Sequence, residues 1–319
     1  MQEKETPMNP LQNFRIARYH IILTALSTIS MPPYAGSTLR GGFGHAFRKM
    51  VCTQGPIDCR DCTLKTVCPY PYIFETAPFE GAQQLRTYGD VPRPFVIDPL
   101  STRGEYRRGE SFVFRLTLVG RAIDYLPYFL VSFRELGKIG IGKGRGRFQL
   151  THVQTDSGES IYDSETQMVH NLNNALNFDE IQHEAASLPT NQLTVHLLTP
   201  TRITHKGQIT DQLPFHLFWR RLIGRISALA YFHCGESLDL DFKGLIAQAE
   251  TVQAVQNSLK WKDWTRYSSR QNQKMKLGGL VGSVTYAGDL AAFLPFVALG
   301  VFLHVGKNAT FGLGKYRIE

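Results

Sequence analysis

Two short motifs occur twice in this sequence, and both pairs of copies are separated by the same 168 positions. Leu126-Pro127-Tyr128 matches Leu294-Pro295-Phe296, and the glycine motif of residues 144–148 (GRGRF) matches that of residues 312–316 (GLGKY). A spacing that holds across two motifs indicates an internal duplication, which determines the architecture before local propensities do. We therefore expect two copies of one α/β unit.

The order of elements within each copy predicts the fold. The Leu-Pro pair suits the first turn of a helix, and a glycine-rich loop and a terminal strand follow it. Each copy begins with an apolar strand (14–26 and 193–198), a loop with proline and an amphipathic helix (about 37–51 and 214–232). This order is ferredoxin-like. We expect an α+β fold with two such domains, at 12–153 and 193–319, joined by an acidic linker or surface insertion at 154–192.

The charge of the chain favours an anionic partner. Lysine and arginine total 35 against 27 acidic residues, which gives a net charge of +8. Residues 155–192 hold seven acids and no lysine or arginine, so the two flanking blocks are more basic than the total indicates. A surface this basic favours polyanions, and nucleic acid is the first candidate.

The apolar content indicates a protein outside the membrane. Residues 1–13 are polar and rich in charge, so we expect a cytoplasmic protein rather than a secreted one. The most apolar run, 290–305, is interrupted by Pro295, Gly300 and His304 and is shorter than the ~20 residues of a membrane span. This run is expected to form a buried helix.

The helix expected at 37–51 carries a candidate catalytic group. Its apolar stripe is spaced as for a helix packed on a sheet: Leu39, Phe43, Phe47 and Met50. His45 and Lys49 fall on the opposite face, and Tyr34 precedes the helix N-terminus, where anions bind well. Histidine with lysine and tyrosine is a plausible acid/base set for cleaving a phosphodiester. The alternative is a solvated basic face.

Three segments are candidate phosphate contacts. The loops 140–147 and 306–315 combine glycines with cations and lack the Walker pattern, so they are either phosphate-binding loops or plain turns. Residues 261–276 interleave Trp261, Trp264 and Tyr267 with cations, which suits stacking on bases or a half-buried hairpin. Arg202 is a possible extension of this surface.

Four of the five cysteines are clustered as Cys52-x6-Cys59-x2-Cys62-x5-Cys68. In an intracellular protein this compact spacing favours a metal over disulfides. Four thiolates without a histidine describe a closed zinc site, which we expect to staple an insertion at 52–68. An iron–sulfur cluster also suits the spacing, and chance clustering of reduced thiols is the remaining alternative.

Taken together, these segments resemble the CRISPR-associated endoribonuclease Cas6 family of RAMP proteins. The resemblance rests on residues 33–45 (PYAGSTLRGGFGH), the cysteine cluster, and four segments near the C-terminus: 199–202 (TPTR), 267–271 (YSSRQ), 275–279 (MKLGG) and 305–314 (VGKNATFGLG). It covers nearly the whole chain, and the last two segments are the most specific. The cysteines occur only in some members and indicate a subgroup.

The resemblance implies a repeat RNA of precursor crRNA held across two RAMP (RRM-like) domains and cut without a catalytic metal. The substrate 2′-hydroxyl is the implied nucleophile, which leaves a 2′,3′-cyclic phosphate and a 5′-hydroxyl. His45 is then the general base or acid, Tyr34 its partner and Lys49 the charge stabiliser. The expected RNA contacts are Arg40, Lys143, Arg145, Arg147, Arg202, Arg266, Arg270, Lys274, Lys276, Lys307, Asn308, Gly312, Gly314 and Lys315.

Two other readings stay open at this point. The chain is alternatively a RAMP subunit that binds crRNA inside a CRISPR effector complex without cutting it. The cysteine insertion is alternatively a docking knob for other subunits of such a complex, which is compatible with either activity.

Overall fold

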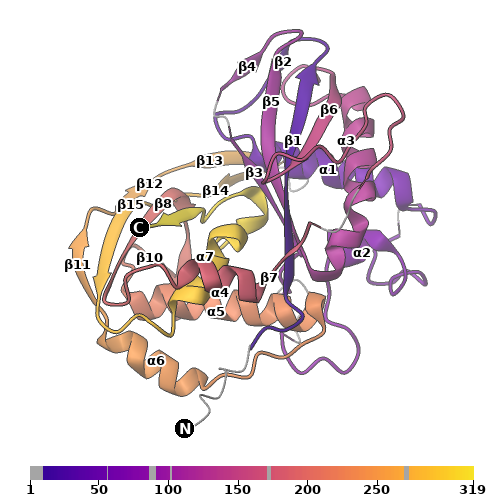
Figure 1. Ribbon diagram of the computed structural model, residues 1–319. Coiled ribbons are helices and arrows are strands. Elements are labelled where there is room, and N and C mark those ends of the chain that lie inside the picture. The colour runs from indigo at the N-terminus through magenta and orange to yellow at the C-terminus, as the bar shows by residue number, and fades with distance from the viewer. Residues whose placement is uncertain (1–9, 56, 86–90, 101–102, 171–173, 269–272) are drawn as a thin grey trace.

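The computed structural model describes residues 10–55, 57–85, 91–100, 103–170, 174–268 and 273–319. Two antiparallel sheets, each covered by helices, lie side by side, with the N-terminal half of the chain forming one and the C-terminal half the other (Figure 1). Among the described residues, no helix has the length and apolar character that crossing a bilayer requires.

The first sheet has the order β3-β5-β1-β6, with β7 also paired to β1. Its strands are β1 (Arg15–Ala25), β3 (Phe95–Pro99), β5 (Ser111–Val119), β6 (Phe148–Thr155) and β7 (Leu176–Asn177). Side chains of β1 alternate between buried and less buried, as expected for a sheet with one face covered. The helices that cover it are α1 (Gly36–Val51) and α3 (Leu126–Ile139), with the short α2 (Pro69–Ile73) and η1 (Gly120–Tyr125) beside them.

The second sheet repeats this plan with the order β11-β15-β8-β16, and β12 also pairs with β15. Its strands are β8 (Gln192–Thr201), β11 (Gln253–Asn257), β12 (Lys260–Lys262), β15 (Gly279–Ala287) and β16 (Tyr316–Ile318). Its helices are α5 (Phe215–Leu229), the π-helical turn η2 (Ala230–Cys234), α6 (Phe242–Thr251), α7 (Leu294–Leu303) and η3 (Ala309–Phe311).

Three small ribbons extend from the two sheets. They are β2 (Ile29–Ser30) with β4 (Glu105–Tyr106), β9 (Ile203–His205) with β10 (Gln208–Thr210), and β13 (Thr265–Ser268) with β14 (Gln273–Lys276). Figure 1 shows β2 and β4 at the far tip of the first domain, and β13 and β14 reaching from the second domain toward β3.

Both sheets have the ferredoxin-like strand order, in which the first and last strands are neighbours and the third strand lies beside the first. The predicted tandem ferredoxin-like α+β fold is therefore confirmed. The duplication is visible in the elements themselves, because α3 and α7 begin at the two Leu-Pro pairs and β6 and β16 begin at Phe148 and Tyr316.

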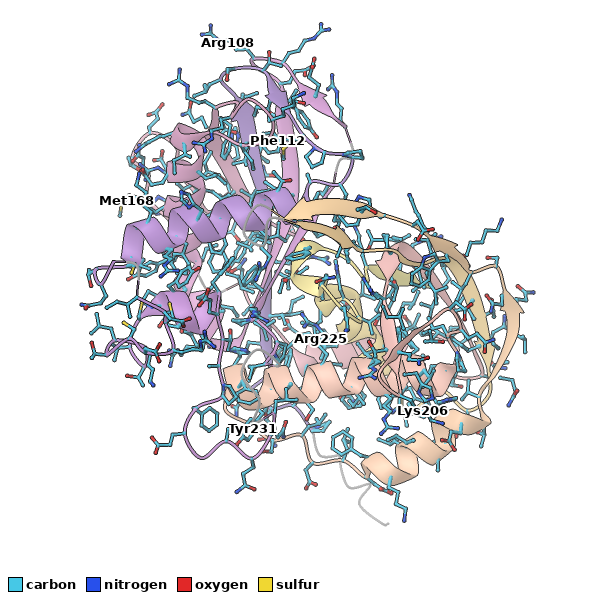
Figure 2. The ribbon with its side chains drawn as sticks, turned by 180° about the vertical axis from the view of Figure 1, so that it is seen from behind. Arg108, Phe112, Met168, Lys206, Arg225 and Tyr231 are labelled. Atoms are coloured by element: carbon cyan, nitrogen blue, oxygen red, sulfur yellow. The ribbon has the colours of Figure 1, made fainter. Side chains whose placement is uncertain are left out.

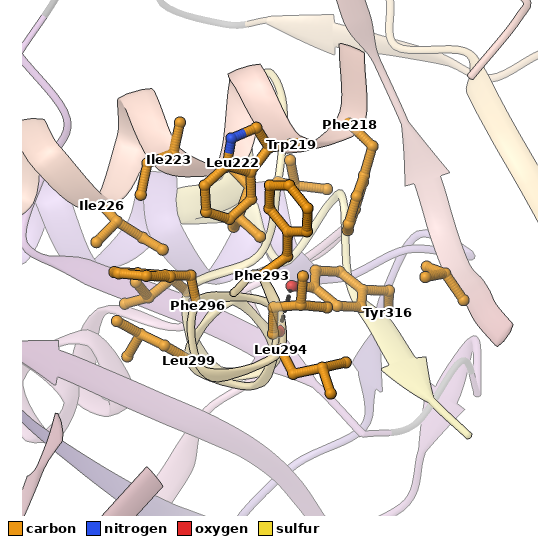
Figure 3. Packing of buried hydrophobic residues seen from close by; sticks show 14 of the residues in the cluster. Phe218, Trp219, Leu222, Ile223, Ile226, Phe293, Leu294, Phe296, Leu299 and Tyr316 are labelled. Atoms are coloured by element: carbon orange, nitrogen blue, oxygen red, sulfur yellow. Dashed lines mark hydrogen bonds between the residues drawn. The ribbon is translucent and has the colours of Figure 1, made fainter. Parts of the chain in front are cut away.

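Aromatic packing holds α5 and α7 together in the second core (Figure 3). The Trp219 ring of α5 meets Phe293 and Phe296 edge-on, with ring centres 4.8 and 5.6 Å away. The Tyr316 hydroxyl donates a hydrogen bond of 2.7 Å to the Val297 carbonyl, so this buried polar group is satisfied. The apolar run that contains α7 is therefore a buried helix, as expected.

The acidic segment contributes directly to this core. Helix α4 (Phe178–Ala185) is capped by Asn177 and Glu180, and it buries Phe178, Ile181 and Ala185. The Phe178 ring lies 5.2 Å from that of Phe296 in α7. Residues from the start of the chain, among them Phe14, belong to the same cluster. Segments outside 193–319 thus complete the hydrophobic core of the second domain.

Candidate nucleic-acid interface

The glycine-rich loop 306–315 sits against the start of α1 in the first domain. A Cβ at Gly36 would lie only 1.9 Å from the Phe311 carbonyl oxygen, and one at Gly312 would lie 2.8 Å from the Ile97 carbonyl. Gly312 also has φ +83°, a conformation that side chains disfavour. Glycine at these two positions therefore permits the close approach of the two domains.

Tyr34 also stabilises the contact between α1 and the glycine-rich loop. Its hydroxyl donates a hydrogen bond of 2.8 Å to the Phe311 carbonyl, and the Trp264 ring meets it edge-on at 5.0 Å. Burial, and then the charge of Asp98, raise the pKa of Tyr34 above its usual value of 10. The phenol is thus protonated at neutral pH and engaged with the loop.

His45 and Lys49 are exposed on the outer face of α1, one turn apart. The predicted stripe packs inward as expected, with Leu39, Phe43 and Phe47 buried. At about 1.5 Å of rise per residue, His45 lies about 14 Å along the helix from Gly36. The structure therefore brings His45 and Lys49 together, and it places Tyr34 at the other end of α1.

A buried ion cluster joins the glycine-rich loop to the first sheet. The Asp98 carboxylate, on β3, accepts hydrogen bonds from Arg115 of β5 at 2.7 and 3.0 Å, and it pairs with Lys315 Nζ at 2.9 Å. The Asp98 side chain is 5% exposed and that of Lys315 is 18% exposed. One carboxylate thus offsets two cations from different domains.

His304 lies behind this cluster at the C-terminal end of α7. It is buried, with φ +60°, and its backbone N–H donates to the Gly300 carbonyl at 2.8 Å. Burial, with repulsion from Lys315 and Arg225, lowers the pKa of His304 to about 4. His304 is therefore neutral at physiological pH.

The amides of the loop are largely occupied. Gly312 N–H donates to the Ala309 carbonyl at 2.8 Å and Gly314 N–H donates to the Pro200 carbonyl at 3.2 Å, and both glycines are buried. Lys307 is exposed and Asn308 is half-buried with φ +65°. Because these amides already have acceptors, we expect the loop to contact a phosphate through its side chains rather than through its backbone N–H groups.

Two predicted arginines are held beside the loop. The Arg40 guanidinium lies 4.2 Å from the Phe74 ring centre and 5.0 Å from that of Phe311, a sandwich of cation and rings. Arg202 is half-buried, and its carbonyl accepts from Lys307 N–H at 3.0 Å. The Arg40 side chain therefore contributes to the contact between the domains, while the Arg202 backbone holds the start of the glycine-rich loop.

The first glycine-rich loop, 140–147, has different neighbours. Lys143 N–H donates to the Ser30 carbonyl at 2.9 Å, and a Cβ at Gly146 would lie 2.3 Å from the Thr28 carbonyl. The Lys143, Arg145 and Arg147 side chains are exposed at this tip, near the turn that carries Arg108 (Figure 2). The duplicated loops thus present cations at two separate places on the surface.

The hairpin β13–β14 contains the remaining predicted RNA contacts. Arg266 pairs with Met275, Lys274 with Tyr267 and Lys276 with Thr265. The positions of these three cationic side chains, and all of Arg270, lie outside what the structure describes.

The four clustered cysteines line one small apolar hollow of about 20 Å³ beneath the end of α1. Burial raises the pKa of Cys59 to about 11, and it also raises that of Cys68. Within the described part of the chain, no group of three or more His, Cys, Asp or Glu side chains is arranged to hold a metal ion. The predicted metal-binding insertion is thus not shown by the structure, although its four cysteines line the same hollow.

Sequence reasoning missed Asp98 and Arg115. The sequence did offer one indication of this ion cluster: Asp98 is a lone acid within the apolar strand 95–99 (FVIDP), and a buried carboxylate needs a partner. The partner, however, comes from the neighbouring strand and from a loop 217 residues away.

Comparison with known proteins places the chain in a family. Residues 14–174, just over half of the chain, match the family model described as AF_1859_N, N-terminal domain, and residues 195–316 match that of the CRISPR-associated endoribonuclease Cas6. An uncharacterized protein of Archaeoglobus fulgidus is 27% identical over 298 residues, covering 91% of this chain and 93% of the relative.

Solved structures share the fold. A Cas6 product complex has a TM-score of 0.59 at 16% identity, covering 95% of this chain and 100% of that one. Thermus thermophilus Cas6 has a TM-score of 0.55 at 16% identity, covering 96% of this chain and 99% of that one. A chain of a partial Cas6-RT-Cas1–Cas2 complex has a TM-score of 0.58 at 15% identity, covering 96% of this chain and 46% of that one. The chain belongs to the AF_1859 N-terminal domain family, and its residues 195–316 match the model of the CRISPR-associated endoribonuclease Cas6 family.

Proposed function

We propose that this protein binds CRISPR repeat RNA and cleaves precursor crRNA without a catalytic metal. The match of residues 195–316 to the Cas6 endoribonuclease family carries the proposal, because that region ends in the glycine-rich loop seated against α1. The exposed His45 and Lys49 on the same helix supply groups suited to the chemistry. The similar fold of a Cas6 product complex is consistent with it.

In the proposed reaction the 2′-hydroxyl of the RNA attacks the adjacent phosphorus and the bond to the 5′-oxygen breaks. His45 takes the proton from the 2′-hydroxyl or gives one to the departing 5′-oxygen. Lys49 stabilises the charge that develops on the phosphoryl oxygens. The products are a 2′,3′-cyclic phosphate and a 5′-hydroxyl. Tyr34, whose hydroxyl is engaged by Phe311, is assigned to holding the loop unless RNA displaces that bond.

The RNA is proposed to contact two cationic regions. The first is the contact between the glycine-rich loop 306–315 and α1, where Lys307 is exposed, its N–H bonds to the Arg202 carbonyl, and Arg40 packs on Phe311. The second is the tip with Lys143, Arg145 and Arg147. Lys315 is held by Asp98, so we assign it to positioning the loop.

Incubation with labelled repeat RNA in EDTA tests the activity, followed by analysis of the product ends. A 2′,3′-cyclic phosphate in the presence of EDTA is the expected result. RNA that is bound and never cut would instead identify a RAMP subunit of an effector complex. Affinity is expected to fall as salt rises, because phosphate contacts release counterions.

We also propose that the four cysteines bind a structural zinc ion. The proposal rests on their shared hollow and on thiolate chemistry, since four sulfur ligands suit zinc. Protein purified without added metal is expected to contain one zinc per chain by mass spectrometry of the metal. The paired variant Cys59→Ser/Cys62→Ser is expected to lose it, while Cys234→Ser, outside the cluster, retains it. Wild-type protein that contains no zinc would remove the proposal, and iron in its place would identify an iron–sulfur cluster.

A further inference from the structure

Elsewhere between the two domains, an open hollow of about 650 Å³ has no role in the proposed cleavage. It lies where the first residues of β1, the turn η1 and helix α2 meet the π-helical turn η2. Figure 2 marks this end of the molecule by Tyr231, far from the tip that carries Arg108. Its volume is within the range of small-molecule sites, about 300–1,000 Å³.

One wall of the hollow is aromatic. The Phe79 ring stacks on Tyr231 with centres 5.4 Å apart and planes 24° apart, and it meets Phe232 at 5.6 Å. Phe79 is nevertheless 52% exposed. The wall is therefore a stacking surface with apolar area still open.

Another part of the lining is cationic. The Arg121 guanidinium lies 4.4 Å from the Tyr72 ring centre, which orients it. The pairing of Ile16 with Val119 places Arg15 next to Gly120 and hence beside Arg121. Both arginines are exposed, and among the described lining residues Asp124 is the only acid.

The buried part of the lining is fixed in place. His233 is buried, its Nε2–H donates to the Pro92 carbonyl at 2.8 Å, and the Tyr72 hydroxyl donates to its Nδ1 at 3.3 Å. Burial lowers the pKa of His233 to about 4, so the ring adds no charge. A Cβ at Gly120, where φ is +55°, would lie 2.1 Å from the His233 carbonyl. The hollow is thus preformed rather than a gap between loosely packed parts.

We infer that this hollow binds a nucleotide, with the base stacked on Phe79 and the phosphate held by Arg15 and Arg121. An aromatic surface and a pair of arginines lining one hollow are the two features that recognise a base and a phosphate. The nucleotide is either free or part of an RNA strand. The free form stands apart from the proposed endoribonuclease, whereas the strand form rests on it.

Calorimetric titration of the full chain separates the two sources. One arm uses AMP and UMP, and the other uses 5′-phosphorylated trinucleotides of the same bases. Arg121→Met removes the charge but keeps a long side chain, and Phe79→Leu keeps an apolar side chain without a ring. Lys243→Met, which removes an exposed cation from α6, is the matched control. Thermal unfolding of each variant confirms that it is folded.

We expect both test variants to weaken binding about tenfold, within the range for loss of one stacked base, and the control to bind as the wild type does. Binding of AMP or UMP identifies a free-nucleotide site, and binding of the trinucleotides alone identifies a strand site. Absence of binding in both arms, or binding that survives either substitution, overturns the inference. Cleavage of repeat RNA by the same variants is measured in parallel, so a failure of the proposed function is seen separately.

Discussion

Replacing His45 with alanine is expected to slow cleavage of repeat RNA by about 10²- to 10⁴-fold, the usual contribution of a general acid or base. RNA affinity should stay within a few-fold, because His45 lies on the exposed face of α1 and its removal leaves the buried stripe intact. Single-turnover rates at saturating enzyme, together with binding of a non-cleavable 2′-deoxy substrate, measure the two effects separately.

The matched control for this prediction is His152→Ala. His152 is also an exposed histidine of the first domain, but it lies on strand β6 rather than on helix α1. The His152→Ala variant should cleave repeat RNA at the wild-type rate. Equal rates for the His45 variant and the wild type would exclude His45 from the mechanism and would leave the RNA-binding proposal standing.

Replacing Asp98 with asparagine is expected to destabilise the protein by about 2–3 kcal/mol. The variant leaves Arg115 and Lys315 without their counter-charge, and both side chains are mostly buried between the domains. Removing one partner of a buried ion pair costs about 3–5 kcal/mol, and the partial exposure of these two cations reduces that cost. The same change should weaken RNA binding, because the glycine-rich loop loses its tie to β3. Urea unfolding and RNA titration measure the two losses.

A double-mutant cycle tests the cause. Adding Lys315→Met to the Asp98 variant removes one of the orphaned cations, so the two changes together should cost less than their sum. Asp58→Asn is the control, since Asp58 pairs with Arg60 in an exposed contact and should leave stability unchanged. Strict additivity of the Asp98 and Lys315 effects would show that the two groups do not interact.

The sequence predicted what depends on local order. The repeat located the first turns of α3 and α7 and the starts of β6 and β16, because a duplicated motif keeps its role in both copies. The helical spacing of Leu39, Phe43 and Phe47 correctly gave the buried face of α1, and hence the exposure of His45. Periodicity reports which way a side chain faces relative to its own helix.

The remaining features depend on which parts of the chain meet, which periodicity does not report. Tyr34 and Lys315 have polar groups that suit RNA, but their partners, Phe311 and Asp98, lie in the opposite domain. The acidic composition of 154–192 indicated a linker. Helix α4 nevertheless places Phe178 and Ile181 inward and its acids outward. A helix of this length has too few apolar positions for the periodicity to be recognised in the sequence.

This interleaving has a consequence for how the protein is handled. The C-terminal core contains Leu11, Phe14 and Ile16 from the start of the chain and Phe178 and Ile181 from the middle, while β7 hydrogen-bonds to β1. A fragment beginning at residue 193 would expose the apolar surface that these side chains cover. Neither half is therefore a sound unit for separate expression, and a protease nick near residue 190 should yield two pieces that co-elute until denaturant is added.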